Sequence, residues 1–240
     1  MKEKLFTIPV NDAFKEDCEC PICSMRDSLE RDLIDFTMGP SYMEDDIRAV
    51  TSKLGFCREH IQLLYKNQNR LGLALILKSH LDKTIKDVEK LSGANSKLQV
   101  PSFFKKKKPE GNPLVDYLNE IEESCYICSR METTIDRYIA TVFYLYHNED
   151  DFRERFKQCK GFCNKHYKML YDSAPQYLKG DELDSFVKLL NKLYLDNMKR
   201  LQEDLEWFIN KFDYRYADEP WKNAKDALPR AIQKINGIVQ

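Results

Sequence analysis

Apolar residues recur at helical spacing in two long segments of the chain. In Met25–Phe36 and in Met131–Tyr146, apolar side chains return every three or four positions, as they do along one face of an α-helix. A third segment, Asp184–Phe212, keeps this spacing over a longer stretch. No segment alternates apolar and polar residues as a half-buried strand would. The pattern therefore predicts an all-α protein.

Shorter helices are expected after the first two segments. The stretch SYMEDDIRAVTSKL offers Ser41 as an N-cap, and HNEDDFRERFKQC offers Asn148 in the same role. Acidic residues follow in the first turn of each stretch, where the helix dipole favours negative charge. A further helix is expected near each of the two GFC stretches.

The chain also repeats one cysteine–histidine pattern. A Cys-x-x-Cys motif is followed 34 positions later by a Cys-x-x-His motif in the first half, and 35 positions later in the second half. The acidic stretch EDDIR lies between the motifs of the first half, and EDDFR takes its place in the second. Landmarks that recur in one order predict an internal duplication. The motif residues are Cys20, Cys23, Cys57 and His60 in the first copy and Cys125, Cys128, Cys163 and His166 in the second.

The duplication divides the chain into four parts. Residues 1–92 are predicted to form the N-terminal repeat and residues 114–212 the C-terminal repeat. Residues 93–113, which include FFKKKKPEGNP, are typical of a basic linker because proline, glycine and lysine crowd together there. The repeated pattern stops before residues 213–240, which we expect to pack on the repeats as a tail.

Each copy carries the ligands of one metal site. A Cys-x-x-Cys turn presents two sulfurs on one side, and Cys-x-x-His on a helix adds a sulfur and a nitrogen from one face. Together they make a tetrahedral Cys3His set, which is typical of structural zinc. Gly55 and Gly161 suit a sharp bend before each of these helices, and Phe56 and Phe162 are expected to pack beneath the sites. The sequence thus predicts two tandem, metal-stapled helical repeats with one Cys3His site and one Zn²⁺ ion in each copy.

The identity of the metal has an alternative. Cys18 and Cys159 place one extra thiol near the motifs, so an iron–sulfur cluster is also compatible with the composition. These two cysteines stand at different offsets in the two copies and therefore break the repeat. A thioredoxin-like redox role for the cysteine pairs would require a βαβ pattern, which the sequence lacks.

Composition narrows the cellular setting. Of 240 residues, 42% are hydrophobic and 32% are charged, and the formal net charge of −1 does not favour a general polyanion binder. No secretion signal is visible, and the longest apolar run, Leu71–Leu77, is too short to span a membrane. We therefore expect a cytoplasmic protein with no membrane partner. Eight cysteines in a reducing compartment favour metal binding over disulfides.

Several sequence stretches together resemble a known family. The stretches are DCECPIC, GFCREH, CYIC, GFCNKH and DALPRAIQKING. They resemble an uncharacterised bacterial family of clostridial type, which is catalogued as domain of unknown function 6062. The resemblance extends over nearly the whole chain and implies that the eight motif residues are the family's matching positions. It implies no established activity.

Function is left with three hypotheses. No nucleophile elbow, phosphate-binding glycine loop or HExxH motif is present, so the leading one is a non-enzymatic, zinc-stabilised binding or adaptor protein with a protein partner. A nucleic-acid-binding regulatory protein is an alternative, because Lys105–Lys108 next to two phenylalanines could contact phosphates and bases. The third is an enzyme or redox protein in which one site is an iron–sulfur cluster or an open metal site.

Overall fold

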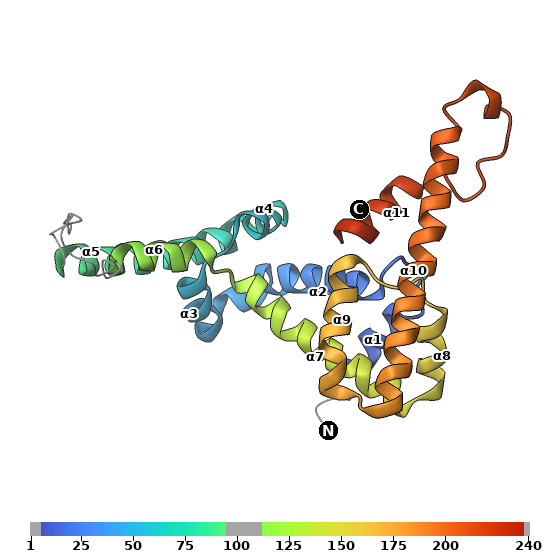
Figure 1. Cartoon of the computed structure of the whole chain (residues 1–240). Coiled ribbons are helices and arrows are strands. Elements are labelled where there is room, and N and C mark those ends of the chain that lie inside the picture. The colour runs from blue at the N-terminus through green and yellow to red at the C-terminus, as the bar shows by residue number, and fades with distance from the viewer. Residues whose placement is uncertain (1–5, 95–111, 238–240) are drawn as a thin grey trace, which may run out of the picture. The chain divides into compact units, whose positions relative to one another are not determined.

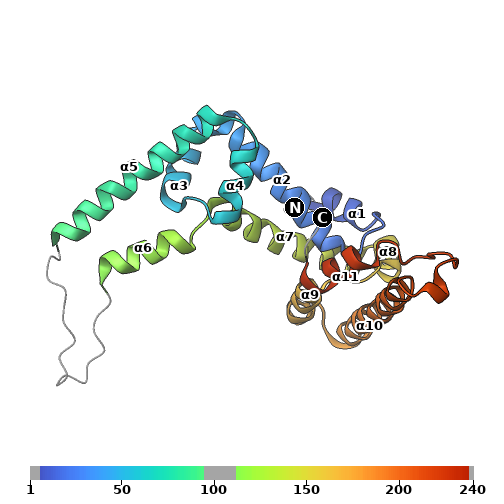
Figure 2. The same cartoon turned by 90° about the horizontal axis from the view of Figure 1, so that it is seen from above.

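The structure is a computed structural model, and it describes residues 6–94 and 112–237. These residues form eleven α-helices and no strand, so the predicted all-α class is confirmed (Figure 1 and Figure 2). None of the helices in this part of the chain combines the length and the apolar content that a membrane span requires. In chain order the helices are α1 (Thr7–Ala13), α2 (Pro21–Met38), the 3-10 helix η2 (Pro40–Met43), α3 (Asp45–Leu54), α4 (Arg58–Lys66), α5 (Arg70–Ala94), α6 (Pro113–Glu123), α7 (Tyr126–Asn148), α8 (Asp150–Gln158), α9 (Asn164–Tyr177), α10 (Gly180–Asn210), the 3-10 helix η3 (Tyr214–Tyr216) and α11 (Ala227–Asn236).

The helices expected from apolar spacing are confirmed. Met25–Phe36 lies within α2 and Met131–Tyr146 lies within α7. The third segment is α10, which starts at Gly180 and ends at Asn210, close to the expected bounds. A helix also follows each GFC stretch, as α4 and α9.

The two N-caps predicted from the sequence are wrong. Glu44 and Glu149 occupy the N-cap positions of α3 and α8, and neither side chain makes a capping hydrogen bond. Ser41 lies in η2 and its hydroxyl donates back to the carbonyl oxygen of Phe36. Asn148 is the last residue of α7, and its Nδ2 donates to the carbonyl oxygen of Tyr144 at 2.8 Å. Both side chains therefore close the preceding helix instead of opening the next one.

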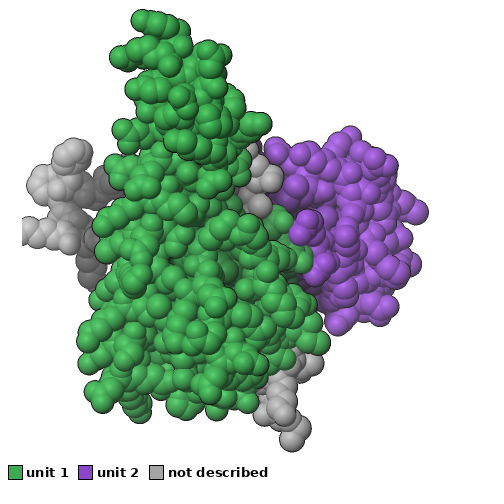
Figure 3. Space-filling view, turned by 90° about the vertical axis from the view of Figure 1, so that its right-hand side faces the viewer, with its two compact units in different colours: residues 1–29, 133–240 green, residues 30–132 purple. Residues whose placement is uncertain are grey.

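The chain divides into two compact units, coloured separately in Figure 3. The first unit comprises Met1–Leu29 and Thr133–Gln240, and the second comprises Glu30–Glu132. The first unit thus holds α1, the start of α2, the end of α7, and α8 to α11. The second unit holds the end of α2, then α3 to α6, and the start of α7. Each unit therefore combines elements from both sequence copies.

An aromatic cluster forms the core of the first unit. Phe14 packs against Phe152 with ring centroids 4.9 Å apart, and Phe156 lies 5.3 Å from Phe162 and 5.4 Å from Phe186. All five rings are buried. They come from α8, α10 and the segments next to α1 and α9, so the cluster fixes the loop that leads into α9. Burial of this much aromatic surface is a large stabilising contribution.

The second unit is built around α5. The helices α3, α4 and α6 all pack on α5, and α5 and α6 run side by side (Figure 2). Nδ1 of His80 on α5 lies 2.8 Å from the carbonyl oxygen of Ser52 on α3. Leu64, Ile76 and Ile127 are fully buried and form part of the core. The α6 helix, in contrast, contains no buried residue.

The C-terminal segment is part of the first unit and packs on its other helices. The α11 helix contacts both α9 and α10. Nε1 of Trp207 on α10 donates to the carbonyl oxygen of Pro220 at 3.0 Å, and Trp221 packs against Phe208. Most of the predicted basic linker, including Lys105–Lys108, lies outside the described residues.

Candidate metal centres

Eight cysteine and histidine side chains gather into two groups. In each group, three sulfurs and one ring nitrogen all lie within 4.8 Å of one another. Each group falls inside one unit, and each could hold a metal ion. The first site consists of Cys20, Cys23, Cys163 and His166, and the second site consists of Cys57, His60, Cys125 and Cys128.

The grouping expected from the sequence, one complete set per copy, is wrong. Each site takes its Cys-x-x-Cys pair from one copy and its Cys-x-x-His pair from the other. The reason lies in α2 and α7, which have 18 and 23 residues and so are about 27 and 35 Å long. Each helix carries the chain away from its own cysteine pair before the chain turns toward the histidine. The predicted Cys3His composition holds, but the copies exchange their halves.

The distances in the first site fit a single ion. Nδ1 of His166 lies 3.4 Å from Sγ of Cys20, 3.3 Å from Sγ of Cys23 and 3.2 Å from Sγ of Cys163. The sulfurs of Cys23 and Cys163 are 3.5 Å apart. A tetrahedral zinc ion would separate its sulfur and nitrogen ligands by about 3.6–3.8 Å. A small adjustment of side chains would therefore admit the ion.

The second site has nearly the same dimensions. Nδ1 of His60 lies 3.1 Å from Sγ of Cys57 and 3.3 Å from the sulfurs of Cys125 and Cys128. The sulfurs of Cys57 and Cys128 are 3.9 Å apart. In both sites Nδ1, and not Nε2, faces the three sulfurs.

Helix N-termini converge on each site. Cys57 and Cys163 are the N-cap residues of α4 and α9, and the histidines stand three positions later, in the first turn. The Cys-x-x-Cys pairs straddle the first residues of α2 and α7 in the same way. Each site therefore lies at two helix N-termini, whose partial positive charge stabilises thiolates.

The expected sharp bends before the histidine helices are present. Gly55 and Gly161 have φ angles of 59° and 76°, which favour glycine. A Cβ on Gly161 would also approach the carbonyl oxygen of Leu193 to 3.1 Å. Phe162 is fully buried in the aromatic cluster, and Phe56 packs edge-on against Tyr126 at 6.3 Å.

The cysteine thiols of the two sites differ in pKa, and this affects how the sites would bind a metal. In the first site, hydrogen bonds from Cys20 and Cys23 hold the pKa of Cys163 far below its usual value. In the second site, burial opposes ionisation of Cys125, but hydrogen bonds, first from His60, outweigh it and lower the pKa to about 6. The other thiols have raised pKa values, and burial and the charge of Cys125 raise that of Cys128 to about 12. A metal ion needs all three thiolates, so its binding releases protons and weakens as the pH falls.

The histidine of the second site has a carboxylate partner, and among the described residues no such partner contacts His166 of the first site. Nε2 of His60 lies 3.1 Å from a carboxylate oxygen of Glu30 on α2. A carboxylate in this place fixes the ring and makes the ligating nitrogen more basic. Glu30 stands seven positions after Cys23, and the equivalent residue of the other copy is Ile135, which is buried. Nothing in the sequence motif pointed to Glu30.

The first site is closed by a residue of the tail. Lys234 on α11 is completely buried, and its Nζ donates to the carbonyl oxygens of Glu19 at 2.6 Å and Lys160 at 2.5 Å. Its Nζ also lies 3.3 Å from the buried carboxylate of Glu19. The carbonyl oxygen of Gly237 lies 4.0 Å from Sγ of Cys23. Lys234 thus joins the two ligand-bearing segments of the first site, which sequence reasoning did not anticipate.

The equivalent junction in the second site is closed locally. The hydroxyl of Ser124 donates to the carbonyl oxygen of Leu54 at 2.6 Å, and the N–H of Tyr126 donates to that of Gly55 at 3.0 Å. Ser124 and Tyr126 flank Cys125, and Leu54 and Gly55 precede Cys57. The two hydrogen bonds therefore hold the two ligand-bearing segments together without a third segment.

The remaining candidates lie outside both sites. Cys18 and Cys159 belong to neither group, and burial raises the pKa of each thiol to about 11. His147 lies 2.9 Å from the carboxylate of Glu182, and His80 contacts α3 as described above. None of these four residues therefore belongs to either of the two ligand groups.

Comparison with known proteins identifies a family and nothing beyond it. The sequence model of a family of unknown function, DUF6062, matches residues 1–240. No curated protein matches the chain, and no solved structure does.

Proposed function

The chain belongs to the DUF6062 family, and we propose that it is a zinc-stabilised binding or adaptor protein without catalytic activity. The observation that carries the proposal is the pair of complete Cys3His groups. A zinc ion held by four protein ligands keeps no open position for a substrate, which is the mark of a structural site.

Zinc suits the donor atoms better than an iron–sulfur cluster does. Thiolate sulfur together with imidazole nitrogen in a tetrahedral arrangement is a preferred zinc environment. Most iron–sulfur clusters are held by four cysteines, and the two spare cysteines, Cys18 and Cys159, lie outside both groups. A cytoplasmic location fits this proposal, since reduced thiols are needed for the sites.

The ions would join segments that are distant in the sequence. The first site links Cys23 to Cys163 across 140 positions, and the second links Cys57 to Cys128 across 71. Structural zinc in small peptides contributes an apparent free energy of about 10–16 kcal/mol at neutral pH. This is comparable to the whole free energy of unfolding of a domain, about 5–15 kcal/mol. The metal is therefore proposed to be part of the fold.

The binding role is supported by apolar surface on the second unit. Leu81 and Ile85 on α5 and Val115 and Leu118 on α6 are about half exposed, although all four are large apolar side chains. Each pair stands one helical turn apart, so its two side chains share a face of their helix, and clustered exposed apolar side chains commonly mark a protein interface. A protein partner is therefore proposed for the α5–α6 pair.

Metal content and stability test the zinc part of the proposal. We expect two zinc ions per chain by elemental analysis, a colourless solution, and a large fall in the thermal midpoint after a strong chelator is added. Stoichiometric iron with visible absorbance, or melting curves that the chelator does not change, would contradict it.

Pull-down from native lysate tests the adaptor part. A tagged chain is expected to recover a stoichiometric protein partner, and the Ile85→Asp variant is expected to lose it while keeping both zinc ions. Glu89→Gln, an exposed polar change on the same helix, is the matched control. Failure to recover any stoichiometric protein would count against this role without affecting the zinc proposal.

A further inference from the structure

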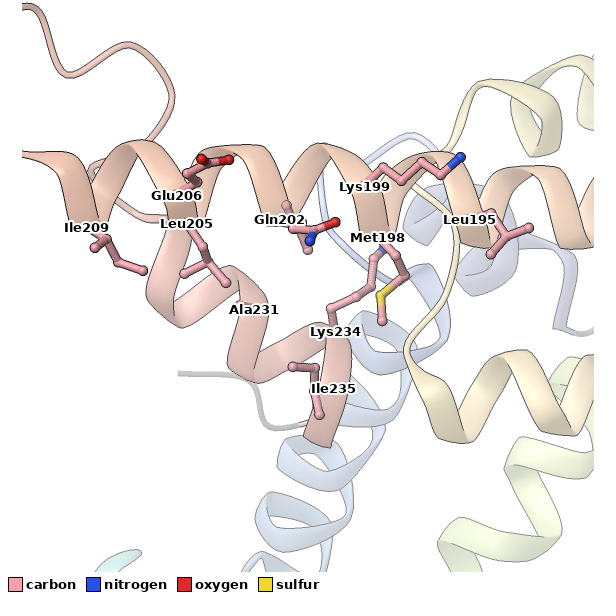
Figure 4. Close-up of a pocket in the computed structure, with 11 residues that line it drawn as sticks. Leu195, Met198, Lys199, Gln202, Leu205, Glu206, Ile209, Ala231, Lys234 and Ile235 are labelled. Atoms are coloured by element: carbon pink, nitrogen blue, oxygen red, sulfur yellow. The ribbon is translucent and has the colours of Figure 1, made fainter.

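An apolar groove of about 670 Å³ runs between α10 and α11 in the first unit (Figure 4). Its lining includes Met198, Leu201 and Leu205 from α10 and Ala231 from α11. Large apolar side chains also stand at its edges and are more than half exposed. These edge residues are Leu195 and Ile209 on α10 and Ile235 on α11, with exposed fractions of 54%, 66% and 52%.

The α10 side of the groove has the spacing of a coiled-coil seam. Its open stripe consists of Leu195, Met198, Gln202, Leu205 and Ile209. The steps between these positions alternate between three and four residues, as the a and d positions of a heptad do. In these terms Leu195, Gln202 and Ile209 are a residues, and Met198 and Leu205 are d residues. The stripe is thus patterned for another helix.

The two flanks of this stripe differ. On one flank are the g positions, which are apolar: Leu201 is buried and lines the groove together with Ala231 of α11, and Phe208 packs on Trp221. On the other flank the e positions, Lys199 and Glu206, are exposed. Figure 4 shows both charged side chains on the side of α10 away from α11. Within the described residues, neither Lys199 nor Glu206 forms an ion pair.

We propose that this stripe binds a second copy of the chain, with the two α10 helices antiparallel. In an antiparallel pair, a positions pack against d positions. Met198 then faces Ile209 of the second copy, and Gln202 faces Leu205 of the second copy. The twofold axis repeats both contacts, so all the central positions of the stripe are used once by each copy.

The charges select this register. When Met198 faces Ile209 of the second copy, the e positions pair with each other, and Lys199 lies opposite Glu206 of the second copy. The twofold axis makes a second, identical pair. A parallel dimer would instead set the e positions against the g positions, Leu201 and Phe208, which are apolar and carry no charge. Only the antiparallel arrangement gives both exposed charges a partner.

Gln202 strengthens the choice of register. A single polar residue at an a position lowers the stability of a coiled coil but fixes its alignment. The stripe from Leu195 to Ile209 is about 21 Å long, which is short for a stable dimer. We therefore expect a dimer that dissociates on dilution instead of an obligate one.

Charge-reversal variants of the full chain, as purified, test the proposal by sedimentation over a wide concentration range. The unmodified chain is expected to dimerise. Lys199→Glu alone and Glu206→Lys alone each create two like-charged contacts, and each is expected to weaken the homodimer tenfold or more. An equimolar mixture of the two variants is expected to restore dimerisation as a heterodimer, because each Glu then faces a Lys. The double variant on one chain is expected to form the homodimer again.

A control variant away from the seam completes the experiment. Glu203→Lys changes an exposed charge at a b position, away from the seam, and is expected to leave the dimer unchanged. Both substituted positions are exposed, so the helical circular dichroism of all variants should match. A chain that stays monomeric at every concentration overturns the proposal. This holds even if a different protein is found to bind the stripe. A dimer that ignores the single reversals, or is not restored by mixing, overturns the antiparallel register.

Discussion

The two metal sites have the same types of ligand, three cysteines and one histidine, but differ in their exposure to solvent. In the first site all four ligands are buried, and their exposed fractions do not exceed 2%. In the second site Cys125 and His60 are buried, whereas Cys57 and Cys128 are partly exposed. The same Cys3His chemistry is thus placed once in a core and once near a surface.

The junction between ligand-bearing segments explains this difference. In the second site, Ser124 and Tyr126 bridge directly to the carbonyl groups before Cys57. In the first site the equivalent of Tyr126 is Pro21, which has no N–H to donate. The ammonium group of Lys234 takes over and donates to both segments.

The tail contacts the first site, whereas none of its described residues contacts the second, so we expect only the first site to depend on it. The α11 helix brings Lys234 and also places Gly237 beside the sulfur of Cys23. The tail therefore both joins and covers the first site. Among the described contacts of the second site none comes from the tail, and two of its ligands are partly exposed, so we expect its ion to exchange with a chelator faster than the ion of the first site.

Paired ligand substitutions give the largest expected effect and test whether the sites are crossed. Cys20→Ser with Cys163→Ser removes two ligands from the first site only, so one zinc ion per chain should remain. Cys20→Ser with Cys57→Ser removes one ligand from each site, so both ions should be lost or greatly weakened. The difference is large because each structural ion is worth about 10–16 kcal/mol in model peptides. Elemental analysis of the purified variants measures it.

The reverse result for the two double variants would show that the sites are not crossed. If each copy held its own ion, the Cys20 and Cys57 double variant would keep one zinc ion and the Cys20 and Cys163 variant would lose both. Cys18→Ser with Cys159→Ser is the matched control, since these thiols belong to neither group. It should keep two ions.

The sequence predicted the helices and the eight motif residues but not how they combine. Periodic apolar positions such as Leu29, Leu33 and Ile139 determine α2 and α7 through burial, and the structure confirms these helices. The crossing could not be predicted, because both copies carry the same motifs at nearly the same spacing. Either Cys-x-x-His motif could complete a Cys3His site with either Cys-x-x-Cys motif. The lengths of α2 and α7 decide which motifs meet.

The residues that support the sites were missed for a different reason. Glu30 acts through its contact with His60, and Ser124 acts through its hydrogen bond to Leu54, but neither residue belongs to a motif. Lys234 did leave a signal, because it continues the buried spacing of Ala227 and Ala231 along α11. A lysine on the apolar face of a helix is rarely buried without partners. Its partners lie about 75 and 215 positions away in the sequence, so the sequence could not identify them.

Removing the tail's lysine should affect the first site alone. Lys234→Met keeps the length of the side chain but removes the donor to Glu19 and Lys160. The carboxylate of Glu19 keeps Arg200 at 2.5 Å, but it loses one of its buried charged neighbours. We expect the free energy of unfolding to fall by about 3–5 kcal/mol. Zinc release from the first site should become faster, which a chelating dye can follow.

The second site serves as the internal reference for this variant. A background of Cys20→Ser with Cys163→Ser isolates the second site, and Cys57→Ser with Cys128→Ser isolates the first. Lys234→Met should change the release rate only when the first site is present. Lys225→Met, an exposed change just before α11, is the control. Equal acceleration at both sites would show that the tail does not act on the first site specifically.

The smallest expected effect concerns the carboxylate on His60. Glu30→Gln keeps the shape of the side chain but removes the charge that lies 3.1 Å from Nε2. Loss of such a partner commonly lowers metal affinity about 10–100-fold, because the ring becomes less basic and less well oriented. The second site should therefore bind zinc more weakly in competition with a chelator. The first site, where Ile135 stands at the equivalent position, should be unchanged.

Asp32→Asn on the same helix separates this effect from a general loss of charge. Asp32 is exposed and lies two positions from Glu30, so its substitution should leave both affinities unchanged. If Glu30→Gln and Asp32→Asn behave alike, the carboxylate of Glu30 contributes only to the overall electrostatic field at the second site. If Glu30→Gln alone weakens the second site, the more exposed site holds its ion partly through a carboxylate, where the buried site has Ile135 at the equivalent position. Orientation of the histidine then offsets the greater solvent exposure of the second site.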